Sequence, residues 1–527
     1  MPATVTGFCE PRLMSATPVP AASFQFQAVA ELPALAWIAV LKRGASAARV
    51  YCGRHVETHD GFFIEGVWAG EFSEAKFDAS DCVFGSGGHI AEGKVTFVTS
   101  TATMDFLYLY DAGAVMYVSN SLALVLSFAN DQLDPRCLNY ATINWSIAKG
   151  IKKYITEIPT RNNFVKRIVH RNVEYSGGAL DVVDKPLPPR FESFAAYRDY
   201  LACRLAMCMQ NARHRGRRKK LRIYSTQSKG YDCTAINAIA RDFGVGEAFT
   251  VQTGKSNRAT ADRERGREPD DDGTDICSVL GIEAIPIDRR QIESDNSDEL
   301  LYWAGMHRPS DFNMCGIAAH AEAPALLLTG HLGEIWYSKD ATRPGTVNDE
   351  LVLIGVVTEV RLKTGYVQLP APFIGARRRE DIFRITNSAE MSPWKLNVRY
   401  DRPIPRRIAE EAGVPRHMFG QHKTASVVEL AQPSLPLNER LRDDFLEFLN
   451  SSGLLEKWSC RLFPVVHAYN AFAAYKGRSQ NINAYYADRL VRTLTLGHRG
   501  LGPLWKHLDG SIYCFAVNRL AANSPRP

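Results

Sequence analysis

Cysteine motifs are scarce in this sequence, and their scarcity limits what the chain can be. Its 11 cysteines are scattered and odd in number, and none forms a CxxC pair. We therefore expect neither a disulfide framework nor a structural zinc site, and a reducing cytoplasm fits best. No basic segment followed by an apolar run stands near the start, so we expect no secretory signal.

Long apolar runs and a strong net charge are missing too. The most apolar stretch near the start, residues 32–41, has about half the length of a membrane span, so we expect no membrane association. The chain has 63 basic and 57 acidic residues, and this net charge of +6 is too mild to indicate nucleic-acid binding. The densest basic run, residues 213–220, contains no aromatic residues, so we interpret it as the solvated end of a helix.

The composition is that of a globular protein with several cores. The chain has 527 residues, of which 45% are hydrophobic and 23% charged, which suggests about three domains. Residues 1–185 contain short apolar runs separated by Gly, Asp and Ser, a pattern typical of strands. The runs are residues 36–41, 61–67, 94–98, 106–110 and 114–118. The glycine-rich stretch 85–88 lies among them, and we predict a hairpin turn there.

The middle of the chain alternates helices with strands. A proline-rich linker at 186–189 precedes Ser193, which we predict as the N-cap of a helix with apolar residues every three or four positions. Strands are predicted over residues 221–225, 249–251, 283–287 and 325–328, and a further helix near Asp232. This alternation predicts a doubly wound parallel sheet over residues 190–430. Residues 431–527 are predicted to be helical.

A highly charged segment, residues 255–275, interrupts this pattern. We predict a solvated surface loop. Its three consecutive aspartates, residues 270–272, leave a magnesium site open as an alternative, although the solvated loop is favoured.

The most informative segment, residues 225–234, lies between a predicted strand and a helix start. Such a turn offers unpaired backbone N–H groups and the positive end of a helix dipole, which suit a phosphate. Lys229 adds a positive charge, Gly230 permits close approach of an anion, and Asp232 can hold a metal. The predicted nucleotide contacts are Ser225, Gln227, Ser228, Lys229, Gly230, Asp232, Cys233 and Thr234, together with Val251 at the end of the next strand.

This loop does not match the pattern GxxxxGK[ST], but it resembles the SGGxDS pyrophosphate loop of the asparagine synthetase-like ATP pyrophosphatase family. Ser228, Gly230 and Asp232 match that pattern. Lys229 stands where the family has a glycine, and Cys233 replaces the last serine with a weaker donor.

A second loop, residues 329–336, resembles the family's SGEGxDE segment. Gly330 matches its first glycine, and Glu334 stands where the family has a magnesium-binding aspartate. His331 takes the place of a glutamate in asparagine synthetase and a tyrosine in β-lactam synthetase. The resemblance implies that His331 acts on the amine, for which an imidazole is a suitable base.

Weaker matches complete the resemblance. Lys423 corresponds to a late-loop lysine that stabilises the acyl-adenylate and the departing pyrophosphate. Asp311 is a weak candidate for contacting the amine. Residues 113–122 look like the closing strands of the family's glutaminase-like sandwich, an Ntn-type domain that needs a cysteine at position 2. Because this chain has Pro2, we expect that domain to be degenerate.

The resemblance therefore implies three regions: a degenerate Ntn-like sandwich over residues 1–185, an ATP pyrophosphatase domain over 190–430, and a helical C-terminal extension over 431–527. It implies ATP and Mg²⁺ as cofactors and a small-molecule carboxylate and amine as substrates. The carboxylate would be activated as an acyl-adenylate and then captured as an amide, with ammonia or a substrate amine as nitrogen source. A homodimer is compatible with the sequence. Two alternatives stay open: a nucleotide-binding pseudoenzyme or interaction module, and a relative that adenylates a different oxygen.

Overall fold

The computed structural model describes most of the chain, with several gaps. The described residues are 22–176, 178–252, 255–256, 270–287, 299–305, 311–313, 316–337, 358–398, 400–421, 424–425, 427–429, 439–454 and 508–525. The structure describes only the backbone of residues 255–256, 311–313, 318, 424–425, 427–429, 439 and 508–509.

The first part of the chain forms two sheets packed face to face, as its alternating apolar runs predict. A seven-stranded sheet has the order β1-β3-β2-β9-β8-β11-β10, and a six-stranded antiparallel sheet has the order β13-β12-β7-β6-β5-β4. Trp37, Phe63 and Phe97 fill the space between them, with the rings of Trp37 and Phe63 4.9 Å apart. The strands are β1 (Ser23–Ala28), β2 (Trp37–Lys42), β3 (Ala47–Cys52), β4 (Glu57–His59), β5 (Phe62–Trp68), β6 (Val83–Ala91), β7 (Lys94–Val98), β8 (Phe106–Asp111), β9 (Val115–Ser119), β10 (Glu157–Pro159), β11 (Phe164–Val169), β12 (Asn172–Ser176) and β13 (Ala179–Val183).

The hairpin turn predicted for residues 85–88 is wrong. These glycines lie inside β6, paired with residues 63–66 of β5. A Cβ atom at Gly85 would collide with backbone atoms of Glu65 and Gly66. The glycines therefore allow the two strand backbones to approach closely, which is the usual meaning of glycine within a strand.

The second part of the chain contains the predicted parallel sheet with helices against it. Its strands are β14 (Arg222–Thr226), β15 (Glu247–Val251), β17 (Glu283–Ile287), β19 (Ala325–Thr329) and β20 (Tyr366–Pro370), and all adjacent pairs are parallel. The order in space is β17-β15-β14-β19-β20. β14 and β19 are neighbours in space, although they are the first and fourth strands of this sheet along the chain. From β14 the chain builds the sheet outward through β15 and β17, and it then returns to add β19 and β20 on the other side of β14. Two short pairs, β16 (Lys255–Ser256) with β21 (Thr424–Ala425) and β18 (Asp311–Asn313) with β22 (Val427–Glu429), lie outside it.

Helices pack against this sheet, among them the two predicted after Ser193 and near Asp232. The predicted N-cap is confirmed, because Ser193 Oγ accepts a hydrogen bond from the Ala196 backbone N–H at 3.2 Å. α3 then buries Phe194, Tyr197, Leu201, Leu205 and Cys208. The helices of the second part are α3 (Phe194–Arg213), α4 (Tyr231–Ala240), α6 (Thr274–Leu280), α7 (Glu299–Ala304), α8 (Thr358–Thr364), α9 (Arg379–Thr386) and α10 (Pro403–Glu411).

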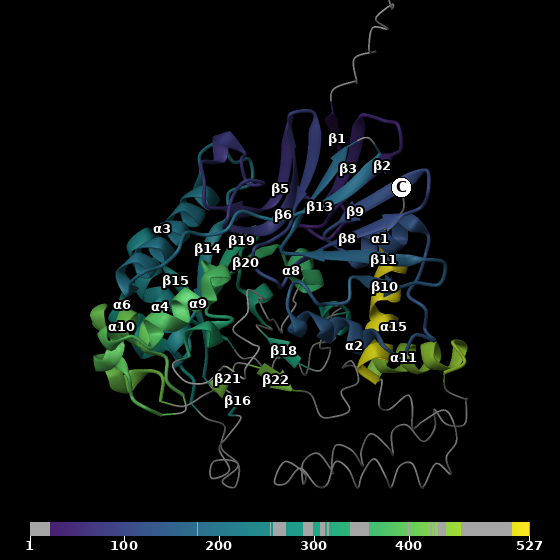
Figure 1. Ribbon diagram of the computed structural model, residues 1–527. Helices are drawn as coiled ribbons and strands as arrows, with labels where there is room; N and C mark the ends of the chain where they lie inside the picture. The colour runs from purple at the N-terminus through teal and green to yellow at the C-terminus, as the bar shows by residue number, and fades with distance from the viewer. Residues whose placement is uncertain are drawn as a thin grey trace, which may run out of the picture.

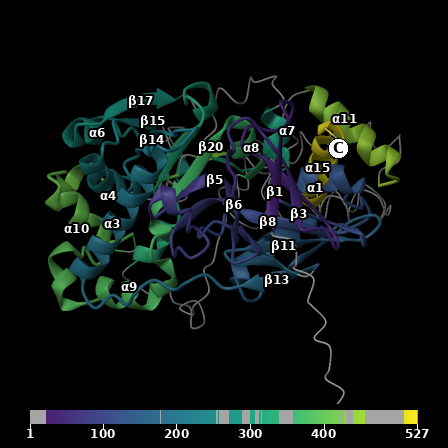
Figure 2. The same cartoon turned by 90° about the horizontal axis from the view of Figure 1, so that it is seen from above.

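The C-terminal region is helical where it is described, and its last helix returns to the sandwich. α11 (Glu439–Ser451) and α15 (Leu508–Asn523) pack together, and α15 also contacts α1 (Leu122–Ala129) and α2 (Tyr140–Trp145). Figures 1 and 2 both show α15, in yellow, beside α1 at the end of the molecule opposite α4, α6 and α10. None of the helices in the described residues is long and apolar enough to cross a bilayer.

Buried charges join the sandwich to the parallel sheet. Arg361 of α8 has no exposed side-chain surface and lies 2.8 Å from Glu65 of β5 and 2.7 Å from Asp105. Beside it, the Glu359 carboxylate accepts hydrogen bonds from Ser121 Oγ and from the Leu122 backbone N–H at the start of α1. The junction is therefore polar, and each acidic group in it depends on a partner from the other part of the chain.

Glu359 makes stability depend on pH. Burial raises its pKa from 4.5 to about 7, so the folded protein holds a proton that the unfolded chain has lost between these values. The contribution of Glu359 to the free energy of unfolding is therefore fully present below pH 4.5 and is lost as the pH rises towards about 7. Urea unfolding should show that Glu359→Gln loses about 1 kcal/mol less stability than wild type between mildly acidic and mildly alkaline pH. The exposed Glu322→Gln should follow the wild-type profile, and parallel profiles for all three proteins would contradict the prediction.

Candidate functional site

The predicted phosphate loop and second loop meet where the strand order of the parallel sheet reverses. The first follows β14 and leads into α4, and the second follows β19 and leads into a 3-10 turn, η6 (Gly333–Trp336). Adjacent parallel strands whose connections leave in opposite directions open a crevice at their carboxyl ends. The geometry therefore brings together residues that stand about 100 positions apart in the sequence.

The phosphate loop is held in shape by its own side chains. Gln227 Nε2 donates to the Ser228 carbonyl at 2.6 Å and to Thr234 Oγ1 at 3.0 Å. Thr234 Oγ1 in turn donates to the Gly230 carbonyl at 2.7 Å. Gln227, Thr234 and Ser225 are all buried. Gln227 and Thr234 thus support the backbone of the loop, whose residues 228–230 are partly exposed, whereas Ser225 Oγ donates to the Glu247 carbonyl of β15.

Two of the three consecutive aspartates lie against this loop. Asp271 Oδ1 accepts the Lys229 backbone N–H at 3.1 Å, and Asp270 forms an ion pair with Lys229 Nζ. The solvated loop predicted for residues 255–275 is therefore wrong at its end, because Asp271 is 1% exposed and α6 begins at Thr274. Asp270 itself stays exposed. The sequence left both a metal and a solvent role open for these residues, and the structure shows a contact with the loop.

The second loop packs its glycines on Asp232. A Cβ atom at Gly330 would lie 2.6 Å from the Cys233 backbone nitrogen and 2.7 Å from Asp232 Cβ, and one at Gly333 would overlap the Asp232 carboxylate. Between them, Leu332 has a φ of 68°, a conformation that non-glycine residues rarely adopt. The Asp232 carboxylate can reach its position only because both glycines lack side chains.

Gly333→Ala should therefore disrupt the site. The added methyl group must displace Asp232 or move the second loop, and we expect affinity for the site's ligand to fall about tenfold or more. The matched control is Gly246→Ala, because a Cβ atom there would meet nothing within 4 Å. Binding of magnesium-ATP measured by calorimetry on both variants checks the prediction, and equal affinities would contradict it.

Arg402 lies in the candidate site, and the sequence did not identify it. It is fully buried, its Nη1 pairs with Asp232, and its Nη2 lies 3.3 Å from Glu334 Oε1. The rings of Tyr337 and Tyr400 flank its guanidinium, with centroids 4.4 and 5.4 Å away. The basic segment 400–407 was the available signal, but nothing in it distinguishes Arg402 from its neighbours.

A second buried arginine supports the loop from the same segment. Arg406 donates to the Tyr231 hydroxyl and lies over that ring, 4.8 Å from its centroid. Burial lowers the pKa of Arg406 to about 10. The Gly420 backbone N–H donates to the Lys229 carbonyl at 2.8 Å, so the segment that leads towards residue 423 also touches the loop.

The remaining predicted residues are placed as follows. His331 stands at the start of the second-loop turn and is partly exposed, and Val251 ends β15. Cys233 Sγ lies 3.7 Å from Thr226 Oγ1, and burial raises the pKa of the thiol. Asp311 begins β18, of which the structure describes only the backbone, and Lys423 lies outside the described residues.

Two carboxylates of the candidate site, those of Asp232 and Glu334, could serve as metal ligands. Asp232 and Glu334 both contact Arg402, and no group of three or more His, Cys, Asp or Glu side chains suited to a metal occurs in the described part of the chain. Mg²⁺ commonly takes one or two protein carboxylates and completes its shell with phosphate oxygens and water. The donor set therefore fits a metal that arrives with a phosphate ligand.

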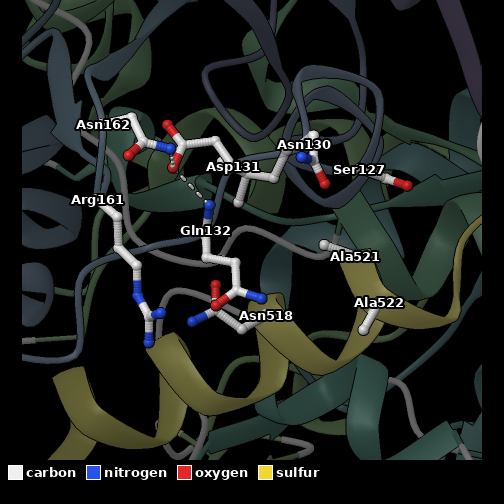
Figure 3. A pocket seen from close by; sticks show the side chains of 10 residues that line it. Ser127, Asn130, Asp131, Gln132, Arg161, Asn162, Asn518, Ala521 and Ala522 are labelled. Carbon is white, nitrogen blue, oxygen red and sulfur yellow. Dashed lines mark hydrogen bonds between the residues drawn. The ribbon is translucent and has the colours of Figure 1, made fainter.

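A polar hollow of about 290 Å³ lies elsewhere, between the sandwich and α15. Figure 3 shows Asp131, Gln132 and Asn162 on its sandwich side and Asn518 and Ala521 on α15. Asp131 is saturated, because it accepts hydrogen bonds from Tyr110, Thr160 and Asn162 and from the Gln132 backbone N–H. Asn518 likewise bonds both backbone groups of Leu133. The hydrogen bonds between Asn518 and Leu133 hold α15 against the sandwich. Because the polar side chains of Asp131 and Asn518 are engaged in internal hydrogen bonds, we propose no ligand for this hollow.

Compared with models of known protein families and with curated proteins, the chain matches none.

Proposed function

We propose that this chain binds ATP at the carboxyl ends of β14 and β19 and uses it to activate a carboxylate, releasing pyrophosphate and then forming an amide. The observation that carries the proposal is the meeting of the two loops at the reversal of strand order, with Gly330 and Gly333 against Asp232. Nucleotides bind at this position in open parallel sheets. The motif resemblance specifies the pyrophosphate-releasing chemistry.

The start of α4 would hold the phosphates. Backbone N–H groups in the first turn of a helix and the helix dipole both favour an anion there. Ser228, Lys229 and Gly230 lie at the accessible surface of the loop, while Gln227 and Thr234 keep its backbone in place. Lys229 would exchange its ion pair with Asp270 for a phosphate oxygen, since a phosphate is the more highly charged partner.

Asp232 and Glu334 would hold Mg²⁺, which supplies charge neutralisation on the phosphates when bound. In the first step, a carboxylate oxygen of the substrate attacks the α-phosphorus, and the bond to pyrophosphate breaks. The guanidinium of Arg402 lies beside both carboxylates and is positioned to stabilise the negative charge that develops.

In the second step, an amine attacks the acyl-adenylate carbonyl and displaces AMP. His331 follows Gly330 directly, so its imidazole is our candidate for accepting the amine proton. Lys423 is our candidate for stabilising the tetrahedral oxyanion, and Asp311 for contacting the amine. The nitrogen would come from ammonia or a substrate amine, and we infer that the sandwich is a degenerate glutaminase-like domain.

Product analysis tests the proposal. The full-length protein, incubated with magnesium-ATP and a panel of carboxylic acids, should catalyse exchange of labelled pyrophosphate into ATP with at least one acid. Adding an amine should then yield AMP and an amide in equal amounts. Formation of ADP and phosphate instead of AMP and pyrophosphate would contradict the chemistry.

A second candidate is a nucleotide-binding pseudoenzyme of the same fold. It is favoured by one observation: Lys229 and Arg402 are both already paired with carboxylates. Such a protein would bind ATP in calorimetry without exchanging pyrophosphate for any acid in the panel. Adenylation of a different oxygen would appear as pyrophosphate release with a hydroxylated substrate.

A further inference from the structure

The guanidinium of Arg402 lies between the two acidic residues of the site and contacts both. One guanidinium nitrogen pairs with Asp232 and the other lies 3.3 Å from Glu334. These carboxylates come from different loops, so no local feature of the chain brings them together. The same positive group neutralises both.

Arg402 is buried in surroundings that stabilise its positive charge. Its side chain has no exposed surface, and the rings of Tyr337 and Tyr400 face the guanidinium. Although burial opposes its charge, Asp232 and Glu334 hold the pKa of Arg402 well above the usual range. Among the described residues, its buried Nε has no hydrogen-bond partner, so the guanidinium retains a donor for an additional anion.

A guanidinium and a magnesium ion cannot occupy this space together. Mg²⁺ requires oxygen ligands at about 2.0–2.1 Å, and a guanidinium offers only N–H donors. Glu334 also interacts with a second arginine, Arg379. Burial lowers the pKa of Arg379, and the negative charge of Glu334 opposes that shift. The carboxylates are thus supplied with internal positive charge before any metal arrives.

We propose that Arg402 is an internal counter-cation that occupies the position between Asp232 and Glu334 and blocks metal binding until a nucleotide brings its own metal. A triphosphate offers the guanidinium a better partner, because Arg binds phosphate oxygens in a bidentate manner. Arg402 then moves from the carboxylates to the phosphates, and the carboxylates become available to the metal. The nucleotide part of this inference rests on the proposed function, whereas the block on metal binding does not.

The test measures metal binding without nucleotide. Mn²⁺ is added to the full-length protein, and its free concentration is followed by electron paramagnetic resonance. Arg402→Met should bind one Mn²⁺ at least about tenfold more tightly than wild type, because it removes the positive charge that lies between the Asp232 and Glu334 carboxylates. Adding Glu334→Gln or Asp232→Asn to Arg402→Met should remove that gain. Equal Mn²⁺ affinity in wild type and Arg402→Met overturns the proposal, as does a gain that survives both additions.

Two further variants keep the test decisive. Arg407→Met changes an arginine of α10, the helix that begins directly after Arg402. Arg407 lies over the rings of Phe194 and Trp394, so this variant should bind Mn²⁺ as wild type does. If Arg402→Met does not fold, Arg402→Gln carries the test: its amide is polar but uncharged, so Mn²⁺ affinity should rise about threefold or more. An unchanged affinity there overturns the proposal too. A chain that fails to bind ATP would contradict the proposed function and leave this result standing.

Discussion

Asp232→Asn is expected to lower ATP–pyrophosphate exchange by about 100- to 1,000-fold, the range seen when one preorganised charge-stabilising group is removed. Asp232 lies at the start of α4, under the glycines of the second loop, and pairs with Arg402. Asparagine has nearly the same shape, so the packing against Gly330 and Gly333 is retained. What is lost is the negative charge that would hold the metal and position the guanidinium.

The measurement is exchange of labelled pyrophosphate, with the affinity for magnesium-ATP determined in parallel by calorimetry. Asp242→Asn is the matched control, because that carboxylate is 71% exposed and lies 3.6 Å from the partly buried guanidinium of its neighbour Arg241. It should leave both quantities unchanged. Wild-type exchange and wild-type ATP affinity in Asp232→Asn would remove the basis for placing nucleotide at this loop.

Arg361→Met is expected to destabilise the protein by about 3–5 kcal/mol, because it leaves buried carboxylates without their partner. Arg361 lies 2.8 Å from Glu65 and 2.7 Å from Asp105, and all three side chains are almost completely buried. The contacts join α8 to the sandwich, so the loss should reduce the stability of the junction as a whole.

Urea unfolding followed by circular dichroism measures this effect. Arg43→Met provides the comparison, since Arg43 pairs with Asp111 at the surface with side chains 46% and 55% exposed. An exposed pair contributes about 0–1 kcal/mol. Similar midpoints for the two variants would show that the buried charges do not stabilise the junction.

Most of the secondary structure followed from local patterns. The apolar residues from Phe194 to Cys208 predicted α3, and Ser193 predicted its start. The apolar run 283–287 matched β17 in full. Such patterns are readable because helix and strand periodicity depends on neighbours a few positions away.

Other features needed the tertiary structure. Residues 85–88 look like turn residues, but they are strand residues because β5 passes close to them. Asp271 looks like part of a solvated run, but it is buried against the phosphate loop. Nothing local in residues 508–523 indicates that α15 packs on α1 and α2. In each case, the deciding neighbour is distant in the sequence.

The candidate site divides in the same way. The sequence by itself determined the strand, loop and helix around residues 225–234 and the candidate loop at 329–336, because the chemistry of each is carried by consecutive residues. Only the tertiary structure decided that both loops meet, and that Arg402 stands between Asp232 and Glu334. Those contacts join residues 170 and 68 positions apart. Electrostatic partners at such separations are selected by the packing of the whole chain, and no local pattern encodes them.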